Sequence, residues 1–202
     1  MLISYLFQNP LIFVFVSVAL ILSISIHEFA HAYSATKLGD PTAKAMGRVT
    51  LNPLAHLDPL GTALLLTAGF GWGKPVLFNP YYLKNPKRDA AVISFAGPFS
   101  NFLLAIVFAV LINLLTPNGE LGGFLYLVVY YNLVLGFFNL IPLHPLDGFK
   151  VVNGFLPESL SIQWMQMAPY GIFVLLLLIL SNTTGRLLGS FIDFALKLLS
   201  LT

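Results

Sequence analysis

The alternation of long apolar stretches with short polar ones predicts a bundle of membrane-spanning helices. A helix needs about 20 mostly apolar residues to cross the hydrocarbon core of a bilayer. Four stretches meet or approach this length, and they cover residues 11–36, 90–115, 123–146 and 164–181. We therefore expect an all-α polytopic membrane protein with about four transmembrane helices, forming a single domain over residues 1–202.

The connection between the first two spans, residues 37–89, contains a further apolar run at 62–70. This run is too short to cross as a helix, so we expect a re-entrant segment that enters the membrane and returns. Two other parts of the connection, 47–53 and 74–80, are short, rich in β-branched residues and end in proline. They predict short membrane-associated β-strands.

The C-terminal tail, residues 186–201, carries polar side chains at spacings of three and four in an otherwise apolar sequence. These side chains are Arg186, Ser190, Asp193, Lys197 and Ser200. A single polar stripe of this kind indicates an amphipathic helix lying in the membrane interface. A contact between copies of the chain in an oligomer is the alternative interpretation.

Composition supports a membrane protein and excludes several functions. Hydrophobic residues make up 57% of the chain and charged residues 9%, whereas soluble domains carry about 25% charged residues. The net charge of +2 is small and the cations are scattered, so we expect no nucleic-acid partner. The chain has no cysteine, which excludes thiolate metal ligands and thiol nucleophiles.

Lysine and arginine are distributed unevenly between the connections, and this bias sets the orientation of membrane proteins. Seven of these residues lie in 37–89, and none lies in 116–122. We therefore expect the N-terminus outside the cell, with 37–89 and 147–163 in the cytoplasm.

The predicted spans contain few ionisable residues, and an ionisable group at membrane depth indicates function. His27, Glu28 and His31 in the first span form an H-E-x-x-H sequence. Residues four apart share one face of a helix, so both imidazoles can bind one metal ion while Glu28 stands beside it as a general base. The alternative is a pair of histidines that bond backbone carbonyls or a neighbouring span.

A catalytic zinc has three protein ligands and one open position, so a third ligand must come from elsewhere. Asp147 follows the third span on the same side of the membrane, after two prolines that break the helix. Zn²⁺ with two neutral imidazoles, Asp147 and Glu28 has no net charge, whereas His144 or His56 in place of Asp147 would leave positive charge at membrane depth. The alternative for Asp147 is an N-cap or a turn residue.

Three motifs in order resemble the site-two protease family of intramembrane zinc metalloproteases. They are HEFAH in the first span, AGPFSN at 96–101 in the second, and Asn139 eight residues before Asp147 in NLIPLHPLDG. The likeness covers residues 20–155 and is closest to compact bacterial and archaeal members without a PDZ domain.

The resemblance implies an enzyme that hydrolyses a peptide bond in or near the transmembrane segment of single-span membrane proteins. It implies one Zn²⁺ per chain, bound by His27, His31 and Asp147, in a multi-pass protein of a prokaryotic cell membrane. Glu28 would activate a zinc-bound water as base and then act as acid, and Asn139 would help hold the scissile carbonyl or its oxyanion.

Other residues have less specific roles in this resemblance. Gly97 and Asn101 fit the G-x-x-x-N helix of the family, where Gly97 permits close packing and Asn101 either contacts substrate or bonds a neighbouring helix. His144 departs from the family pattern and would support the metal site or occasionally bind the ion. His56 would bond locally or line the entrance.

Two rival functions come from other classes. A transporter would also carry ionisable residues at depth, but transporters usually show paired half-repeats, and none appears in the sequence. A noncatalytic zinc-dependent membrane scaffold would fill all four metal positions and need no base. The edge of the predicted strands could bind substrate by strand addition, or the strands could form a plain hairpin at the membrane surface.

Overall fold

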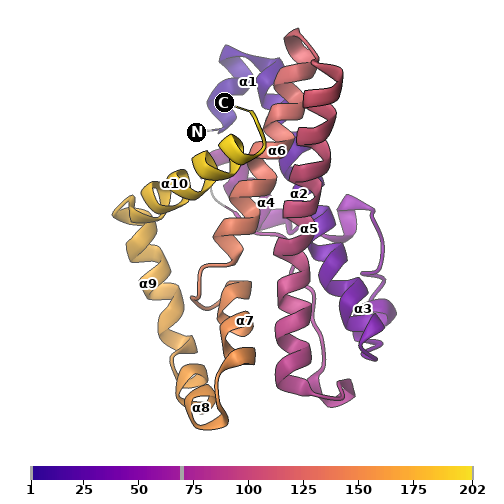
Figure 1. Ribbon diagram of the computed structural model, residues 1–202, viewed down its shortest axis with the longest axis vertical. Helices are drawn as coiled ribbons and strands as arrows, with labels where there is room; N and C mark the ends of the chain where they lie inside the picture. Colours follow the sequence, from indigo (N-terminus) through magenta and orange to yellow (C-terminus); the bar gives the residue numbers. More distant parts are fainter. Residues whose placement is uncertain (1, 69–70, 202) are drawn as a thin grey trace.

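Three long helices form the body of the molecule in the computed structural model, which describes residues 2–68 and 71–201 (Figure 1). They are α2 (Pro10–Lys37), α5 (Pro86–Leu115) and α6 (Gly119–Asn139), and each is long and apolar enough to cross a membrane. A short turn reverses the chain between α5 and α6, which pack side by side and against α2. The all-α membrane class is confirmed.

Local sequence explains where the first two spans begin. The Asn9 side chain accepts a hydrogen bond from the amide of Ile12 and caps α2, and Pro10 follows at the start of the helix. Pro86 starts α5, and the Asp89 carboxylate accepts the amide of Asn85. The second span is therefore longer at its amino end than the predicted 90–115.

The third span ends at Asn139, seven residues before the predicted end. Pro142 and Pro145 lack the amide that continues a helix, so residues 140–146 are irregular, and α7 (Asp147–Phe155) follows them.

The predicted span 164–181 is not one straight helix. It is divided between α8 (Glu158–Gln166) and α9 (Ala168–Leu180), which meet at a bend of 60°. Pro169, in the first turn of α9, lacks the amide needed for an unbroken helix. The pair together has the length and composition of a fourth span.

The connection from α2 to α5 holds short helices: α3 (Thr42–Ala45), η1 (Pro53–Ala55), α4 (Pro59–Ala68) and η2 (Pro80–Tyr82). Within the described residues it contains no strand, only an isolated antiparallel bridge between Leu57 and Gly73, so the prediction of two strands is wrong. Side chains bind the backbone groups that a sheet would pair, as where Glu28 accepts the amide of Val76.

The apolar run at 62–70 falls largely in α4, and its last two residues lie outside the described part of the chain. At ten residues, α4 is too short to cross a membrane as a helix. It contacts α1 (Leu2–Gln8), the helix that precedes the first span. The re-entrant path stays a prediction.

The C-terminal helix α10 (Thr183–Leu198) crosses over α6 in Figure 1. Its buried Ile192 and Leu196 pack against small and branched side chains of α5 and α6, namely Ala105, Ala109, Val129 and Leu133. The polar stripe from Arg186 to Ser200 is exposed on the other side. A location in the membrane interface stays a prediction.

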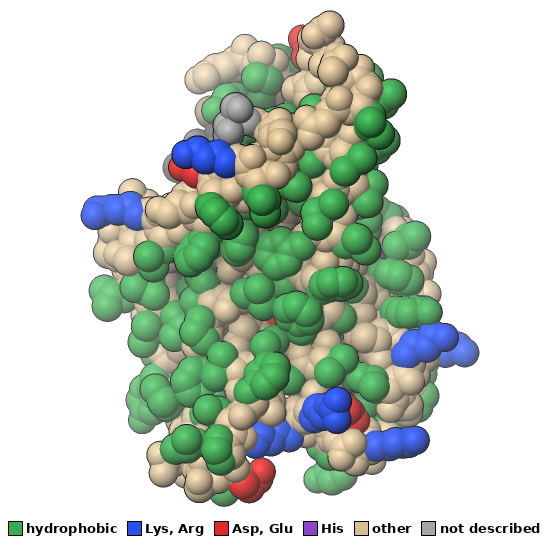
Figure 2. All heavy atoms as spheres, viewed as in Figure 1, with side chains coloured by type: hydrophobic (Ala, Val, Ile, Leu, Met, Phe, Trp, Pro, Cys, Tyr) green, Lys and Arg blue, Asp and Glu red, His purple; other side chains and the backbone are tan. Residues whose placement is uncertain are grey.

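The surface of the molecule has the character expected of a protein surrounded by lipid. In the face shown in Figure 2, hydrophobic side chains cover the middle of the bundle, and most of the visible lysine and arginine side chains gather toward one end. That end holds α8 and the amino end of α5 in Figure 1. The protein is therefore an integral membrane protein with one more cationic end.

Candidate metal centre

Two histidines on one face of α2 begin the site. His27 and His31 are both buried, and their Nε2 atoms lie 3.0 Å apart. Four residues separate them, so one helical turn brings their imidazoles side by side, as the H-E-x-x-H spacing predicts. The face they share points toward α5 and α7.

Asp147, the first residue of α7, comes to the same point from a distant part of the chain. Its Oδ2 lies 3.1 Å from Nε2 of His27 and 3.2 Å from Nε2 of His31. Gly148 makes this approach possible, because a Cβ there would lie 2.2 Å from the carbonyl oxygen of Leu140. The turn after α6 can therefore fold tightly enough to hold Asp147 beside the histidines.

Hydrogen bonds on the far side of each ring determine which nitrogen carries the proton. His31 Nδ1 lies 2.7 Å from the carbonyl oxygen of Ile93, and a carbonyl only accepts, so Nδ1 donates. His27 Nδ1 lies 2.7 Å from Oδ1 of Asn101, which likewise accepts. Both neutral imidazoles therefore present an Nε2 lone pair to Asp147.

Three acceptor atoms thus face one another without a donor between them. Oδ2 of Asp147 is buried and has no hydrogen-bond partner among the described residues. Lone pairs at about 3 Å repel one another unless a cation lies between them. Together, two imidazole nitrogens and one carboxylate oxygen form the only such metal-binding group in the described part of the chain.

The geometry of this group fits zinc. Zn–N distances of about 2.0–2.1 Å in a tetrahedral site place neighbouring ligand atoms about 3.3 Å apart. The observed separations of 3.0, 3.1 and 3.2 Å are close to this value. Two histidines and one carboxylate are also a known ligand set of catalytic zinc sites, which keep the fourth position open.

Helix α5 packs against the two imidazoles without a side chain between them. A Cβ at Gly97 would lie 2.5 Å from both Cε1 and Nε2 of His31 and 2.7 Å from Cε1 of His27. Real Cβ contacts are not this short, so only glycine fits at this position. Gly97 therefore lets the α5 backbone form one wall of the metal centre.

Glu28 lines a cavity of about 140 Å³ next to the three ligand atoms. Its Oε2 accepts the amide of Val76 at 3.1 Å, so the segment 74–78, which is neither helix nor strand, lies over the carboxylate. Asn139, at the end of α6, also lines the cavity and donates through Nδ2 to the carbonyl of Leu135.

The buried Arg48 side chain attaches segment 74–78 to the rest of the connection. Its guanidinium donates to the carbonyls of Ala55 and Lys74. On the other side, the ammonium of Lys150 on α7 lies 4.9 Å from the ring centre of Phe78. The segment is therefore held from both sides of the cavity.

The two remaining histidines lie outside the cluster. His56 is fully buried in the connection, where its Nε2 donates to the carbonyl of Thr50 at 2.7 Å. His144 packs its ring against Phe149, with the ring centres 5.6 Å apart. Neither residue lines the cavity beside Glu28, so their suggested contacts with substrate or metal stay predictions.

Asn132 is a functional candidate that the sequence analysis missed, because it considered mainly ionisable residues. Asn132 on α6 is fully buried and accepts a hydrogen bond from Asn101 Nδ2 at 2.8 Å. An uncharged asparagine in an apolar span is a weaker signal than a histidine or glutamate. A search for every polar residue in the spans would have found it.

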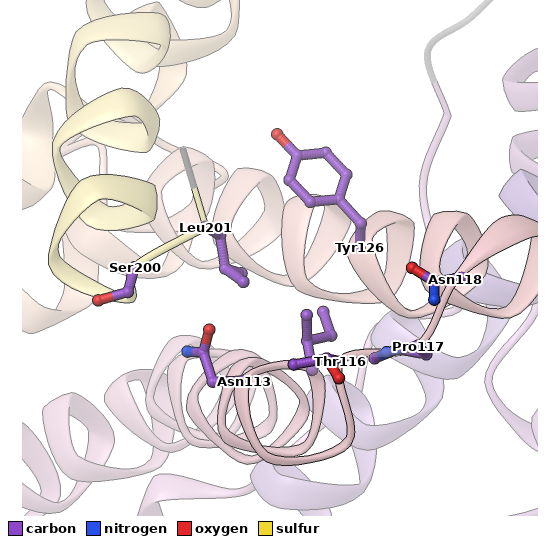
Figure 3. A pocket seen from close by; sticks show the side chains of 9 residues that line it. Asn113, Thr116, Pro117, Asn118, Tyr126, Ser200 and Leu201 are labelled. Atoms are coloured by element: carbon purple, nitrogen blue, oxygen red, sulfur yellow. The ribbon is translucent and has the colours of Figure 1, made fainter.

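A larger cavity, of about 410 Å³, lies at the far end of α5 and α6 (Figure 3). Asn113, Thr116 and Asn118 line it together with Tyr126, and residues 200 and 201 close one side. None of the described residues that line it is a histidine, aspartate, glutamate, lysine or arginine.

An apolar helical bundle around two histidines, a glutamate and an aspartate defines a membrane-embedded metalloprotease. Peptidase family M50 matches residues 15–118 and 116–180 of the sequence. The chain belongs to this family, which is the site-two protease family, and the resemblance seen in the sequence motifs is confirmed.

Curated relatives support the same assignment. The Bacillus subtilis protein named "Putative zinc metalloprotease YwhC" is 41% identical over 184 residues, covering 87% of this chain and 82% of YwhC. Rip2 of Mycolicibacterium smegmatis, described in the same words, is 27% identical over 91% of this chain and 75% of its own length. The zinc metalloprotease MJ0392 of Methanocaldococcus jannaschii is 26% identical over 75% of this chain and 37% of its own length. No solved structure matches the chain.

Proposed function

We propose that this protein is an intramembrane zinc protease that hydrolyses a peptide bond in or near the transmembrane segment of single-span membrane proteins. The observation that carries the proposal is the convergence of three acceptor atoms from His27, His31 and Asp147 beside Glu28. His27, Glu28 and His31 sit on α2, a helix long and apolar enough to cross a membrane. A soluble substrate would not need this setting.

Glu28 is the proton carrier in the proposed reaction. Bound zinc would polarise the scissile carbonyl and lower the pKa of water. Glu28 takes a proton from the attacking water while the water oxygen forms a bond to the carbonyl carbon. Glu28 then gives that proton to the leaving amine nitrogen as the C–N bond breaks. Asn139 also lines the cavity, and we propose that the Nδ2 hydrogen it does not donate to the carbonyl of Leu135 holds the carbonyl oxygen.

We also propose that the site opens toward the cytoplasm. His27 lies ten residues before Lys37, the end of α2, which places it about 15 Å from that end of the helix. The lysine-rich connection and α7 approach the cavity from that end. This arrangement would supply water to a site surrounded by apolar helices.

A helical substrate must unwind before its carbonyl can be attacked. The segment 74–78 beside the cavity is neither helix nor strand, and side chains rather than a neighbouring strand bond its Lys74 carbonyl and Val76 amide. We propose that an unwound substrate pairs with this segment by strand addition. On substrate entry, the Val76 amide would give up its hydrogen bond to Glu28 and donate to the substrate backbone instead.

The test is cleavage of a panel of tagged single-span proteins by the purified, zinc-loaded protein in detergent. We expect Glu28→Gln to bind zinc like the wild type but to cleave about 10²–10⁴-fold more slowly, the usual contribution of a general acid–base group. Glu120→Gln, an exposed glutamate at the start of α6, is the matched control and keeps full activity.

Two outcomes would contradict the proposal. Cleavage by Glu28→Gln at the wild-type rate would exclude Glu28 as the base. Stoichiometric zinc binding without cleavage of any member of the panel would favour the noncatalytic scaffold instead.

A further inference from the structure

We propose that Asn132 is a positioning residue of the metal centre, acting on His27 through Asn101. It is the outer member of a buried chain of side-chain amides that joins α6 to α5 and α5 to α2. The inference rests on the proposed zinc site and assigns a role to a residue that touches neither metal nor substrate.

Each bond of the chain is short and shielded from solvent. Asn132 Nδ2 donates to the Val128 carbonyl at 2.8 Å. Asn101 Nδ2 donates to Asn132 Oδ1 at 2.8 Å and to the Ser23 carbonyl at 3.1 Å. Asn101 Oδ1 lies 2.7 Å from Nδ1 of His27. Asn101, Asn132 and Ser23 are all fully buried.

The chain leaves one consistent arrangement of hydrogens. The Val128 carbonyl only accepts, so the nitrogen of Asn132 faces it and the Asn132 oxygen faces Asn101. That oxygen also only accepts, so it orients the nitrogen of Asn101 toward α6. The oxygen of Asn101 must then face His27 and accept the Nδ1–H, which leaves Nε2 free to bind a metal.

The two histidines differ in how their tautomer is set. His31 donates to the backbone carbonyl of Ile93, which cannot flip. His27 donates to a side-chain amide, which can rotate by half a turn and offer an N–H instead. Asn132 and the Ser23 carbonyl are the two groups that prevent this rotation. Loss of Asn132 should therefore affect His27 and leave His31 unchanged.

Packing alone does not explain an asparagine here. An apolar side chain of similar size would fill the same space between helices at less desolvation cost in a membrane protein. It would also leave an N–H of Asn101 buried without an acceptor. The hydrogen bond that Asn132 accepts from Asn101 therefore explains why position 132 is polar.

The experiment measures zinc dissociation constants by chelator competition for the wild type, Asn132→Leu, Asn101→Leu and the double variant. Loss of a partner behind a metal ligand weakens binding about 10–100-fold. We expect about tenfold for Asn132→Leu, more for Asn101→Leu, and no additional loss in the double variant, because Asn132 acts through Asn101.

Asn113→Leu is the matched control. Asn113 also lies on α5 and donates to a backbone carbonyl, that of Leu199, but it has no connection to the metal centre. We expect it to bind zinc like the wild type. A second readout is the ¹⁵N spectrum of the apo protein labelled in its four histidines. Asn132→Leu should give His27 a mixture of tautomers without changing His31.

Wild-type zinc affinity in Asn132→Leu, or additive losses in the double variant, would overturn the inference. If Asn132→Leu does not fold, Asn132→Ala removes the same acceptor with a smaller side chain, and the same expectations apply. Failure of the wild type to bind zinc would refute the proposed function, whereas normal wild-type binding with an unaffected Asn132 variant refutes this inference alone.

Discussion

Individual residues of the metal centre differ in how visible they are in the sequence. His27, Glu28 and His31 stand out because charge-bearing groups are rare in apolar spans. The position and charge of Asp147 predict it as the third ligand, and its Oδ2 lies 3.1 and 3.2 Å from the Nε2 atoms of His27 and His31. Arg48 and Val76 carry no comparable signal, because their contacts depend on a loop folding over α2.

Asp40, in the turn after α2, is another buried residue with a specific set of partners. One carboxylate oxygen accepts the hydroxyl and amide of Thr42, and the other accepts the amide of Asn79 at 2.6 Å. Burial favours the neutral acid, but these hydrogen bonds outweigh it and lower the pKa of Asp40 below its ordinary value. The ionised carboxylate thus joins α3 to the segment beside the cavity.

We predict that Asp40→Asn lowers the free energy of unfolding by about 1.5–3 kcal/mol at neutral pH, since a charge-assisted hydrogen bond is lost. Because the folded-state pKa is lowered, this stabilisation is present above the unfolded pKa of about 3.9. It is lost as the pH falls through the folded pKa.

Thermal unfolding in detergent over a range of pH measures this difference. The gap between wild type and Asp40→Asn should shrink below about pH 4. Asp193→Asn, at an exposed position on α10, is the control and should leave stability unchanged. A gap that stayed constant into acid would show that the carboxylate charge is not responsible.

Among the secondary-structure elements, α5 has the central position, because it contacts α2, α6 and α7. Its G-x-x-x-N sequence contributes to the metal centre twice. Gly97 brings the helix backbone against both imidazoles, and Asn101 bonds His27 one turn later. The sequence indicated close packing at Gly97, but it could not show that the packed neighbours are metal ligands.

We predict that Gly97→Ala weakens zinc binding at least tenfold, because its methyl group would displace the two imidazoles from their present positions. Gly123→Ala on α6 is the control, since a Cβ there meets no atom within 4 Å. Metal content after dialysis and chelator competition measure both variants. Equal affinities for zinc would mean that α5 can move away without disturbing the histidines.

Element boundaries followed the prolines more closely than the apolar pattern. Pro142 and Pro145 end the third span early, and Pro169 accompanies the bend between α8 and α9. The strand predictions at 47–53 and 74–80 were wrong for a different reason. β-Branched composition favours extended backbone, but a sheet also needs a partner strand, and side chains bind these backbone groups instead.

At the scale of the whole molecule, exposed apolar side chains indicate contact with lipid, and the distribution of charge indicates how the bundle is oriented in the membrane. Large side chains of α9 are exposed, including Tyr170, Phe173 and Leu180. Lipid contact explains such exposure in a helix of this composition. Seven of the ten lysines and arginines lie within residues 37–89, in the connection between α2 and α5 or at the helix ends beside it, which favours a cytoplasmic location for that end.

We predict that single cysteines will show this orientation directly, because the chain contains none. In intact cells, a membrane-impermeant thiol reagent should label Asn118→Cys, in the turn between α5 and α6. It should label Ala45→Cys, in the connection, only after the cells are permeabilised. Both positions are exposed. The reverse labelling pattern would place the metal centre toward the outside.

The sequence by itself determined the membrane class, the approximate positions of the apolar spans and the H-E-x-x-H face, because hydropathy and helical spacing are properties of neighbouring residues. It also supplied the charges that a zinc site requires. Only the tertiary structure decided that Asp147 meets the histidines, that Asn132 orients Asn101 and that Val76 lies over Glu28. These contacts join residues far apart in the chain, so they depend on how the helices pack and on glycines that let them approach.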